Sequence, residues 1–262
     1  VTEQFSICVD MIGSSYVGGL VGGITADHST QIENCSVTGR ITGTSFAGGM
    51  FGNLRGIVTN CDTDTIVSGG VDSWYTGGLA GHAASATING CFALGSVEGH
   101  NSVGGLLGTA DNCSISQCYA AADVNSLPEA SGTSMIGGFV GWLQSGNTVA
   151  DCYSIGSVSG ENNVGGFCSN FQDSSVARCY SAGTVTSSGI HGGFIVYTAG
   201  DYTITHCYYD SETSGCSDTG KGEPLTTVEM KDLDNYSGWD FVTVWDISPT
   251  INGGYPYLRS TP

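Results

Sequence analysis

The side chains with the most chemistry in this sequence are its cysteines, and most of them recur at a regular interval. The chain has 11 cysteines among 262 residues. Thiols at a fixed spacing can form disulfides, bind zinc as thiolates, or pack as small buried side chains. Seven of them are 26 to 34 residues apart, each with an aliphatic residue three positions earlier: Cys35, Cys61, Cys91, Cys118, Cys152, Cys179 and Cys207.

The regular spacing favours a column of free thiols over disulfides. In successive turns of a repeat, equivalent Cβ atoms lie about 4.8 Å apart and point the same way, whereas a disulfide needs about 3.8 Å. A zinc site would need two close pairs, and Cys113 with Cys118 is the only one. We therefore predict an interior column, to which Cys8 could add an eighth member. Cys113, Cys168 and Cys216 lie off the column, and a disulfide between Cys113 and a column cysteine stays open.

No set of side chains predicts a catalytic centre or a dedicated metal site. The 5 histidines are scattered and form no HExxH or Ser–His–Asp arrangement. Asp62, Asp64, Asp210, Glu212 and Asp218 gather near predicted turns, where the default expectation is solvation. Their oxygen atoms would suit calcium, but no EF-hand pattern accompanies them. We predict a non-enzymatic chain without a cofactor, and calcium binding remains an alternative.

Two tryptophans and three asparagines are the candidate contacts with glycans. Trp74 lies in a predicted turn and Trp142 follows a glycine-rich corner, so either could stack on a sugar or fill space between repeats. Asn34, Asn112 and Asn235 match the N-glycosylation acceptor pattern Asn-x-Ser. Because Asn34 precedes a column cysteine, access to it is doubtful.

The elements that must position these side chains are repeats marked by paired glycines, as in "YVGGLVGG" and "YTGGLAGH". We predict a sharp corner at each pair, where glycine permits positive φ and close approach of neighbouring backbones. A phosphate-binding loop would need a helix directly after the glycines, and none is visible. Steps of 27 to 33 residues separate the first glycines, a period typical of solenoids and propellers: Gly18, Gly48, Gly77, Gly104, Gly137, Gly165 and Gly192.

The repeat predicts an all-β protein, a parallel β-solenoid of about seven coils. Its segments are short and rich in β-branched residues, and apolar residues alternate after each cysteine. A propeller blade needs about 40 residues or more. We assign residues 1–209 to the solenoid and 210–262 to a segment that caps the last coil. Its aromatic residues include Trp239 and Trp245, which we expect to be buried, with a sugar-stacking platform as the alternative. Leu225–Leu233 is the one weakly helical stretch.

The repeat resembles the GLUG motif, named for its Gly-Leu-x-Gly core. "VGGLVG", "TGGLAG" and "VGGLLG" are paired here with "CYSIGSV" and "CYSAGTV", and the closing segment "CYYDSETSG" to "NGGYPYL" is also similar. The resemblance extends from about Tyr16 to Leu258. Members of this family are bacterial and archaeal secreted or surface proteins. The resemblance implies an extracellular β-solenoid module and supplies no catalytic residue.

Charge narrows the classes of partner. With 6 Lys and Arg against 24 Asp and Glu, the net charge is −18. Nucleic acid is excluded because its binding relies on basic residues, and no apolar run is long enough for direct membrane insertion. We predict an adhesive, structural or assembly module at the cell surface, with glycans, proteins or copies of itself as partners. The alternatives are a polysaccharide-binding or polysaccharide-degrading β-helix and an ice-binding solenoid, whose regular Thr-x-Thr rows are missing.

Overall fold

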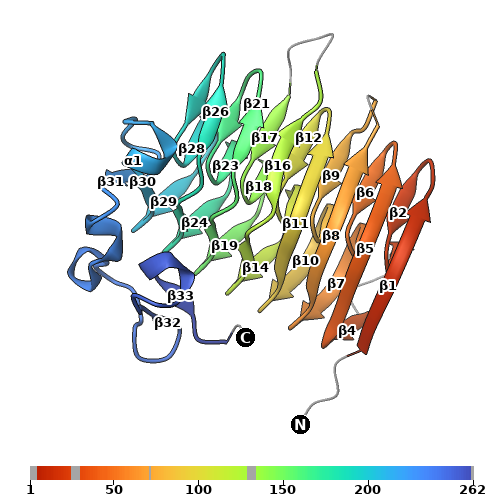
Figure 1. Cartoon of the computed structure of the whole chain (residues 1–262), viewed down its shortest axis with the longest axis horizontal. Coiled ribbons are helices and arrows are strands. Elements are labelled where there is room, and N and C mark those ends of the chain that lie inside the picture. The colour runs from red at the N-terminus through yellow and green to blue at the C-terminus, as the bar shows by residue number, and fades with distance from the viewer. Residues whose placement is uncertain (1–4, 25–29, 71, 129–133, 261–262) are drawn as a thin grey trace.

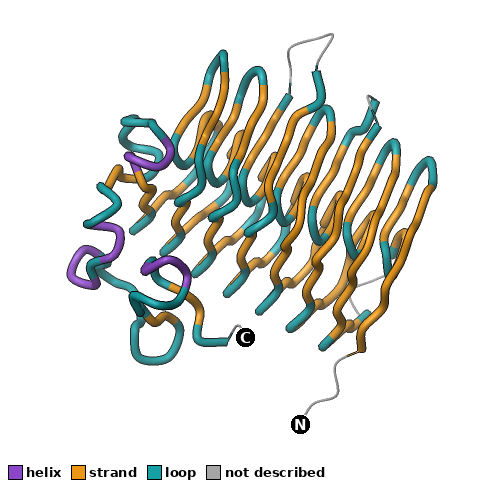
Figure 2. Tube along the Cα trace, in the orientation of Figure 1, coloured by secondary structure: helices purple, strands orange, loops and turns teal. Residues whose placement is uncertain are grey.

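The computed structural model describes residues 5–24, 30–70, 72–128 and 134–260 as a β-solenoid. Each coil contributes strands to three parallel sheets, and the coils stack along one axis (Figures 1 and 2). The predicted fold class is therefore confirmed.

The first sheet contains the strands that follow the cysteines. Its main path runs β1-β5-β8-β11-β15-β20-β25-β30-β31, and it has 12 strands. In the later coils a short break divides the long strand into two. The strands are β1 (Phe5–Ile12), β5 (Cys35–Gly43), β8 (Asp62–Gly69), β11 (Phe92–Gly99), β15 (Tyr119–Ala120), β16 (Asp123–Ser126), β20 (Tyr153–Ser154), β21 (Val158–Gly160), β25 (Tyr180–Ser181), β26 (Val185–Ser187), β30 (Tyr208–Asp210) and β31 (Glu223–Leu225).

The second sheet has seven strands and ends at the glycine pairs. Each strand belongs to one coil and pairs with the equivalent strand of the next coil, so the solenoid has seven coils. The strands are β2 (Tyr16–Gly18), β6 (Phe46–Gly48), β9 (Tyr75–Gly77), β12 (Ser102–Gly104), β17 (Met135–Gly137), β22 (Val164–Gly165) and β27 (His191–Gly192).

The third sheet follows the glycine corner and leads to the next cysteine. It also has 12 strands, and two coils cross it with one long strand each. The strands are β3 (Val21–Gly23), β4 (Gln31–Glu33), β7 (Phe51–Thr59), β10 (Ala80–Asn89), β13 (Leu107–Asp111), β14 (Ser114–Ser116), β18 (Val140–Leu143), β19 (Thr148–Ala150), β23 (Cys168–Gln172), β24 (Ser175–Ala177), β28 (Ile195–Ala199) and β29 (Thr203–Thr205).

The core consists of rows of equivalent residues from successive coils. Alternation along each strand sends every second side chain inward, and the parallel register aligns these side chains with their counterparts. One such row follows the glycine pairs, and its ring pairs Phe139–Phe167 and Phe167–Phe194 stack at 4.6 Å. The fully buried members of this row are Met50, Leu79, Leu106, Phe139, Phe167 and Phe194.

The paired glycines allow close backbone contact and do not supply left-handed backbone. None of the seven first glycines has positive φ, so that part of the prediction is wrong. A Cβ on Gly104 would overlap the carbonyl oxygen of Leu107 and lie 2.8 Å from the Gly141 amide nitrogen. The corner therefore folds so tightly that no side chain fits.

Left-handed backbone instead occurs directly before the column cysteines. Seven consecutive coils place one residue there with φ between 50° and 63°. Asn, Asp and Gly adopt this conformation most readily, although other residues also occupy the row. The turn it makes sends the following cysteine inward. The residues are Asn34, Asn60, Gly90, Gln117, Asp151, Arg178 and His206.

The C-terminal segment covers more than the last coil. After β31 the chain turns back along the side of the solenoid (Figure 1), and Trp245 contacts Tyr153 and Tyr180 of earlier coils. The segment contains α1 (Ser211–Ser214), the 3-10 helices Glu229–Lys231, Leu233–Asn235 and Asn252–Gly254, and the antiparallel pair β32 (Trp245–Asp246) and β33 (Tyr257–Leu258). The predicted cap on the last coil is thus extended over three coils. The weakly helical stretch Leu225–Leu233 contains one short 3-10 helix, Glu229–Lys231, between the end of β31 and the start of the next 3-10 helix.

Candidate functional site

The column cysteines line the interior, one per coil. Cys61, Cys91, Cys118, Cys152, Cys179 and Cys207 are at most 2% exposed, and Cys35 at the first rung is half-buried. Each rung is held by the backbone of its neighbours: the carbonyl oxygen of Cys91 accepts from the Tyr119 amide at 3.1 Å. The Cys91 amide donates to the Sγ of Cys118 at 3.4 Å. All 11 thiols of the chain are free.

The remaining cysteines do not extend the column. The register pairs Phe5 with Cys35 and Cys8 with Thr38, so Cys8 is exposed on the outer face and is not an eighth rung. Cys113, Cys168 and Cys216 are buried and free.

Burial raises the pKa of several interior thiols, among them Cys91 and Cys207, and so keeps them protonated. Loss of hydration raises the pKa of Cys152, and it raises the pKa of Cys168 to about 12. Because the thiolate is the reactive form, such thiols are poor nucleophiles and poor metal ligands at neutral pH. The column therefore acts as packing.

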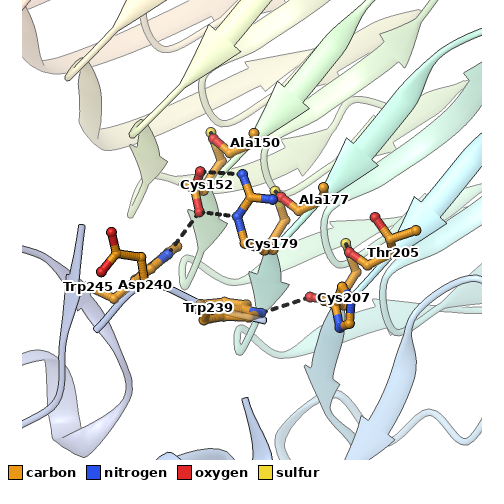
Figure 3. Close-up of polar contacts among 12 residues, drawn as sticks. Ala150, Cys152, Ala177, Cys179, Thr205, Cys207, Trp239, Asp240 and Trp245 are labelled. Atoms are coloured by element: carbon orange, nitrogen blue, oxygen red, sulfur yellow. Dashed lines mark hydrogen bonds and ion pairs between the residues drawn. The ribbon is translucent and has the colours of Figure 1, made fainter. Parts of the chain in front are cut away.

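Polar contacts fasten the C-terminal segment to the column side of the solenoid (Figure 3). Arg178 Nε and Nη2 donate to the two Asp151 carboxylate oxygens at 2.7 and 2.8 Å. Trp245 Nε1 donates to the same carboxylate at 3.1 Å, and Trp239 Nε1 donates to the His206 carbonyl oxygen at 3.0 Å. The left-handed turns before Cys152, Cys179 and Cys207 thus carry the groups that hold the cap.

The aromatic residues of the cap serve structure. Trp245 is fully buried and Trp239 is 8% exposed, as expected for a cap rather than a sugar platform. They pack on a stack of tyrosines from successive coils, in which Tyr153 and Tyr180 lie 5.0 Å apart. Tyr180 also donates to the Pro256 carbonyl oxygen at 2.7 Å.

The acidic residues near the end of the last coil bind the chain's own donors. Asp210 is buried and accepts from the Glu212 and Thr213 amides, from Thr227 Oγ1 at 2.8 Å and from the Tyr255 hydroxyl at 2.6 Å. These bonds join β30, α1 and the cap. Within the described residues, no group of three or more His, Cys, Asp and Glu has an arrangement that could hold a metal ion.

An aromatic strip lies on the outside of the solenoid, where the second and third sheets meet at an inward corner. Its first row comes from the opening residues of the second-sheet strands, and Tyr16, Phe46 and Tyr75 are in register there. The rings of Tyr16 and Phe46 stack at 4.6 Å, and those of Phe46 and Tyr75 lie 5.1 Å apart. The backbone of Gly52 forms the floor of the corner, because a Cβ there would lie 2.6 Å from the Val17 amide nitrogen.

The second row of the strip lies five residues after each first glycine. It faces the first row across the corner: the His82 ring is 5.7 Å from the Tyr75 ring, and Asn170 Nδ2 is 3.2 Å from Met135 Sδ. His82 Nδ1 also bonds Asn53 Oδ1 at 2.9 Å. The row contains Asn53, His82, Thr109, Trp142, Asn170 and Tyr197 in register.

The two predicted glycan-contact tryptophans lie in different places. Trp142 belongs to the second row of the strip and is half-buried on β18. Trp74 is 58% exposed in the turn before β9, directly beside Tyr75 in the chain. The structure therefore joins Trp142 to a larger aromatic surface and leaves Trp74 at its margin.

The three candidate glycosylation asparagines are spread over the molecule. Asn34 is half-buried, and the exposed Asn112 also has left-handed backbone. Asn235 lies in the cap, where its Nδ2 donates to the Glu229 carbonyl oxygen at 3.0 Å.

Most of the strip is missing from the sequence-based candidates, although the sequence contains a signal for it. An aromatic residue occurs two positions before the first glycine in three repeats, and aromatic or amide residues recur five positions after it. Only the turn at the corner reveals that these two positions face each other.

Comparison with known proteins agrees with this architecture. The profile described as "The GLUG motif" matches residues 13–42 and 99–125. The chain carries the GLUG motif. A similar protein from Evansella cellulosilytica, described as a Gly-rich membrane protein, is 35% identical over 136 residues. That stretch covers 50% of this chain and 12% of the relative, so the chain spans a small part of the relative's length.

A solved structure with the same fold has a distant sequence. It is the crystal structure of a protein from Bacteroides ovatus described as an immunoglobulin A1 protease, with a TM-score of 0.54 and 16% identity. The likeness covers 94% of this chain and 75% of the other chain, and it concerns the fold alone. No helix in the described parts of this chain is long and apolar enough to cross a membrane.

Proposed function

We propose that this chain is a non-enzymatic surface module outside the cell, which holds a partner along the side of its solenoid. The proposed partners are cell-surface glycans or proteins, or further copies of the chain. The aromatic strip is the observation that carries the proposal. It places the rings of Tyr16, Phe46 and Tyr75 in register over three successive coils, with Tyr16 51% exposed, and exposed apolar side chains gathered in this way mark interaction sites.

The setting of the chain supports a role in adhesion or assembly. GLUG repeats, a solenoid fold and a relative described as a membrane protein all suit a protein displayed at a surface. The charge of −18 argues against nucleic acid as the partner. A repeated surface also suits repeated partners, because each added coil adds contact area at the same spacing.

A binding assay that also measures turnover tests this proposal. Purified chain is incubated with insoluble cell-wall and host polysaccharides and with intact cells, with and without calcium. Retained protein, new reducing ends and new unsaturated ends are measured together, and sedimentation velocity reports self-association.

The possible results separate the parts of the proposal. Retention or self-association without new chain ends supports an adhesive or assembly module. Appearance of new ends would show that the chain is an enzyme. A chain that stays monomeric and is retained by none of the materials would overturn the adhesive role.

A further inference from the structure

The strip contains one place where two aromatic side chains flank a polar one. Trp142, Asn170 and Tyr197 are in register on β18, β23 and β28, one from each of three successive coils. The Cα atoms of Trp142 and Tyr197 are therefore about 10 Å apart, which is two strand spacings. These three residues line a shallow pocket of about 50 Å³ together with Gln172 and Thr198.

The two aromatic side chains offer apolar faces to the outside. Tyr197 is 42% exposed and Trp142 is half-buried. Flat, rigid rings gain affinity with little loss of conformational freedom when an apolar surface covers them. The C–H faces of a pyranose ring are such a surface, and its rim consists of hydroxyl groups.

The amide between them has unused hydrogen-bonding capacity. Asn170 Oδ1 is buried and has no hydrogen-bond partner among the described residues. Its Nδ2 donates to the thioether sulfur of Met135, which is a weak acceptor. Buried polar atoms without partners are rare in proteins. A ligand hydroxyl can supply the missing bond, since an amide presents a donor and an acceptor.

The charge around the pocket selects against acidic ligands. Gln172 Nε2 donates to Asp173 Oδ2 at 3.2 Å, which places a carboxylate beside the pocket. The whole chain adds a charge of −18. A uronate or sialic acid would be repelled, whereas an uncharged sugar would not.

We propose that Trp142, Asn170 and Tyr197 form a subsite for one neutral pyranose unit of a polysaccharide. The ring packs between the two aromatic side chains, and one hydroxyl or hydroxymethyl group enters the pocket and bonds Asn170. The rest of the polysaccharide lies along the strip toward Tyr75 and Tyr16. This inference rests on the proposed adhesive function and names its partner and its site.

Affinity electrophoresis and calorimetry with defined polysaccharides test the subsite. The probes are the neutral polymers dextran, yeast mannan and laminarin, with polygalacturonate and hyaluronan as acidic comparisons. We expect the wild type to bind at least one neutral polymer and neither acidic one. Trp142→Ala and Tyr197→Ala should each weaken that binding at least about tenfold.

Conservative variants distinguish stacking and hydrogen bonding from a general effect on folding. Tyr197→Phe keeps the ring and should bind nearly as the wild type does. Asn170→Leu keeps the volume but removes the amide, so it should bind more weakly. Phe5→Ala is the control, because it removes an exposed aromatic side chain of the first sheet, outside the strip, and should leave binding unchanged. Trp74→Ala tests the turn before β9 as the alternative site. Far-UV circular dichroism and thermal unfolding verify that every variant folds.

The outcomes separate this inference from the proposed function. If folded Trp142→Ala and Tyr197→Ala bind the neutral polymer within twofold of the wild type, the subsite is wrong although an adhesive role stands. If the wild type binds none of the neutral polymers, the subsite is also wrong, and the adhesive role is then decided by retention on cells and by self-association. Binding lost in Trp74→Ala alone would move the site to the turn before β9.

Discussion

At the scale of single residues, the glycines and cysteines of each repeat have opposite requirements. The glycine corner needs the absence of a side chain, because neighbouring backbone occupies its place. The cysteine position needs a small apolar side chain that fits between two identical neighbours at the strand spacing. Both requirements follow from stacking equivalent residues in register, and neither involves catalysis.

Replacing a corner glycine should destabilise the protein through overlap alone. In Gly104→Ala, the new methyl group would overlap the Leu107 carbonyl oxygen and crowd the Gly141 amide. Because φ is not positive there, backbone conformation contributes nothing to the loss. We expect the free energy of unfolding to fall by more than about 1 kcal/mol. Urea unfolding followed by circular dichroism measures it.

Gly23→Ala is the control for this prediction. A Cβ at Gly23 would make ordinary contacts at 3.8 Å with Asn53 and Tyr16. This variant should differ from the wild type by less than about 0.5 kcal/mol. Equal effects of the two substitutions would contradict the overlap argument.

The thiols should differ sharply in reactivity with a disulfide reagent such as DTNB. Cys8 is exposed and should react at once, and the half-buried Cys35 should react slowly. The buried thiols should react only on unfolding, since burial denies the reagent access to the sulfur atoms. Without reductant, all 11 should react in denaturant.

Cys8→Ser should remove the fast phase of that reaction. A count in denaturant below the full number would reveal disulfides, including the one from Cys113 that the sequence left open. Rapid reaction of every thiol in the native protein would contradict the interior column.

At the scale of elements, the cap is joined to the last coil by a titratable group. Burial by itself raises the pKa of Asp210, but hydrogen bonds from Tyr255, Thr213 and Thr227 outweigh it and hold the pKa below its ordinary value. A carboxyl group with a lowered pKa stabilises the folded state above its unfolded pKa of about 3.9. That stability is lost as the pH falls through the lower, folded value.

Asp210→Asn should therefore weaken the cap at neutral pH, and the difference from the wild type should narrow below about pH 4. Because Trp239 and Trp245 of the cap are buried against the coils, their fluorescence and limited proteolysis after β31 report release of the cap. The exposed Glu161→Gln serves as control and should change neither. A difference that stays constant down to the lowest pH would rule out Asp210 as the titrating group.

The elements of the coils could be predicted because the repeat states the same pattern seven times. The length of the repeat, the alternation of apolar residues and the positions of residues such as Gly77 and Cys91 can all be read from short stretches of sequence. Parallel stacking of the coils follows from this repetition. The path of the cap could not be predicted, since it depends on one long-range carboxylate, Asp151, which meets Trp245 from 94 residues away. Tyr75 and His82 face each other because of the angle between the second and third sheets, and no local sequence pattern predicts that angle.

At the scale of the whole molecule, the excess of acids sets the response to salt. Two ion pairs form among the described residues, Arg178–Asp151 and Arg259–Asp246, while 24 acidic residues face only 6 basic ones. Repulsion among the remaining carboxylates opposes the compact state.

Sodium chloride should therefore raise the midpoint of thermal unfolding as the screening length falls to about 8 Å at 0.15 M. Differential scanning calorimetry measures the midpoint, with potassium chloride as the control for a specific ion effect. A larger rise in calcium chloride at equal ionic strength would reveal calcium binding. A midpoint that falls with added salt would contradict the repulsion argument.

The in-register stacking of equivalent coils has a consequence for how such a molecule changes over generations. Each coil pairs with the one before and the one after through the same positions, so an extra coil between two existing ones meets neighbours of the right shape on both sides. A tandem duplication of one repeat in the gene would lengthen the rod and its aromatic strip by one strand spacing, and would leave the cap as it is. The length of the solenoid would therefore change between generations by whole coils.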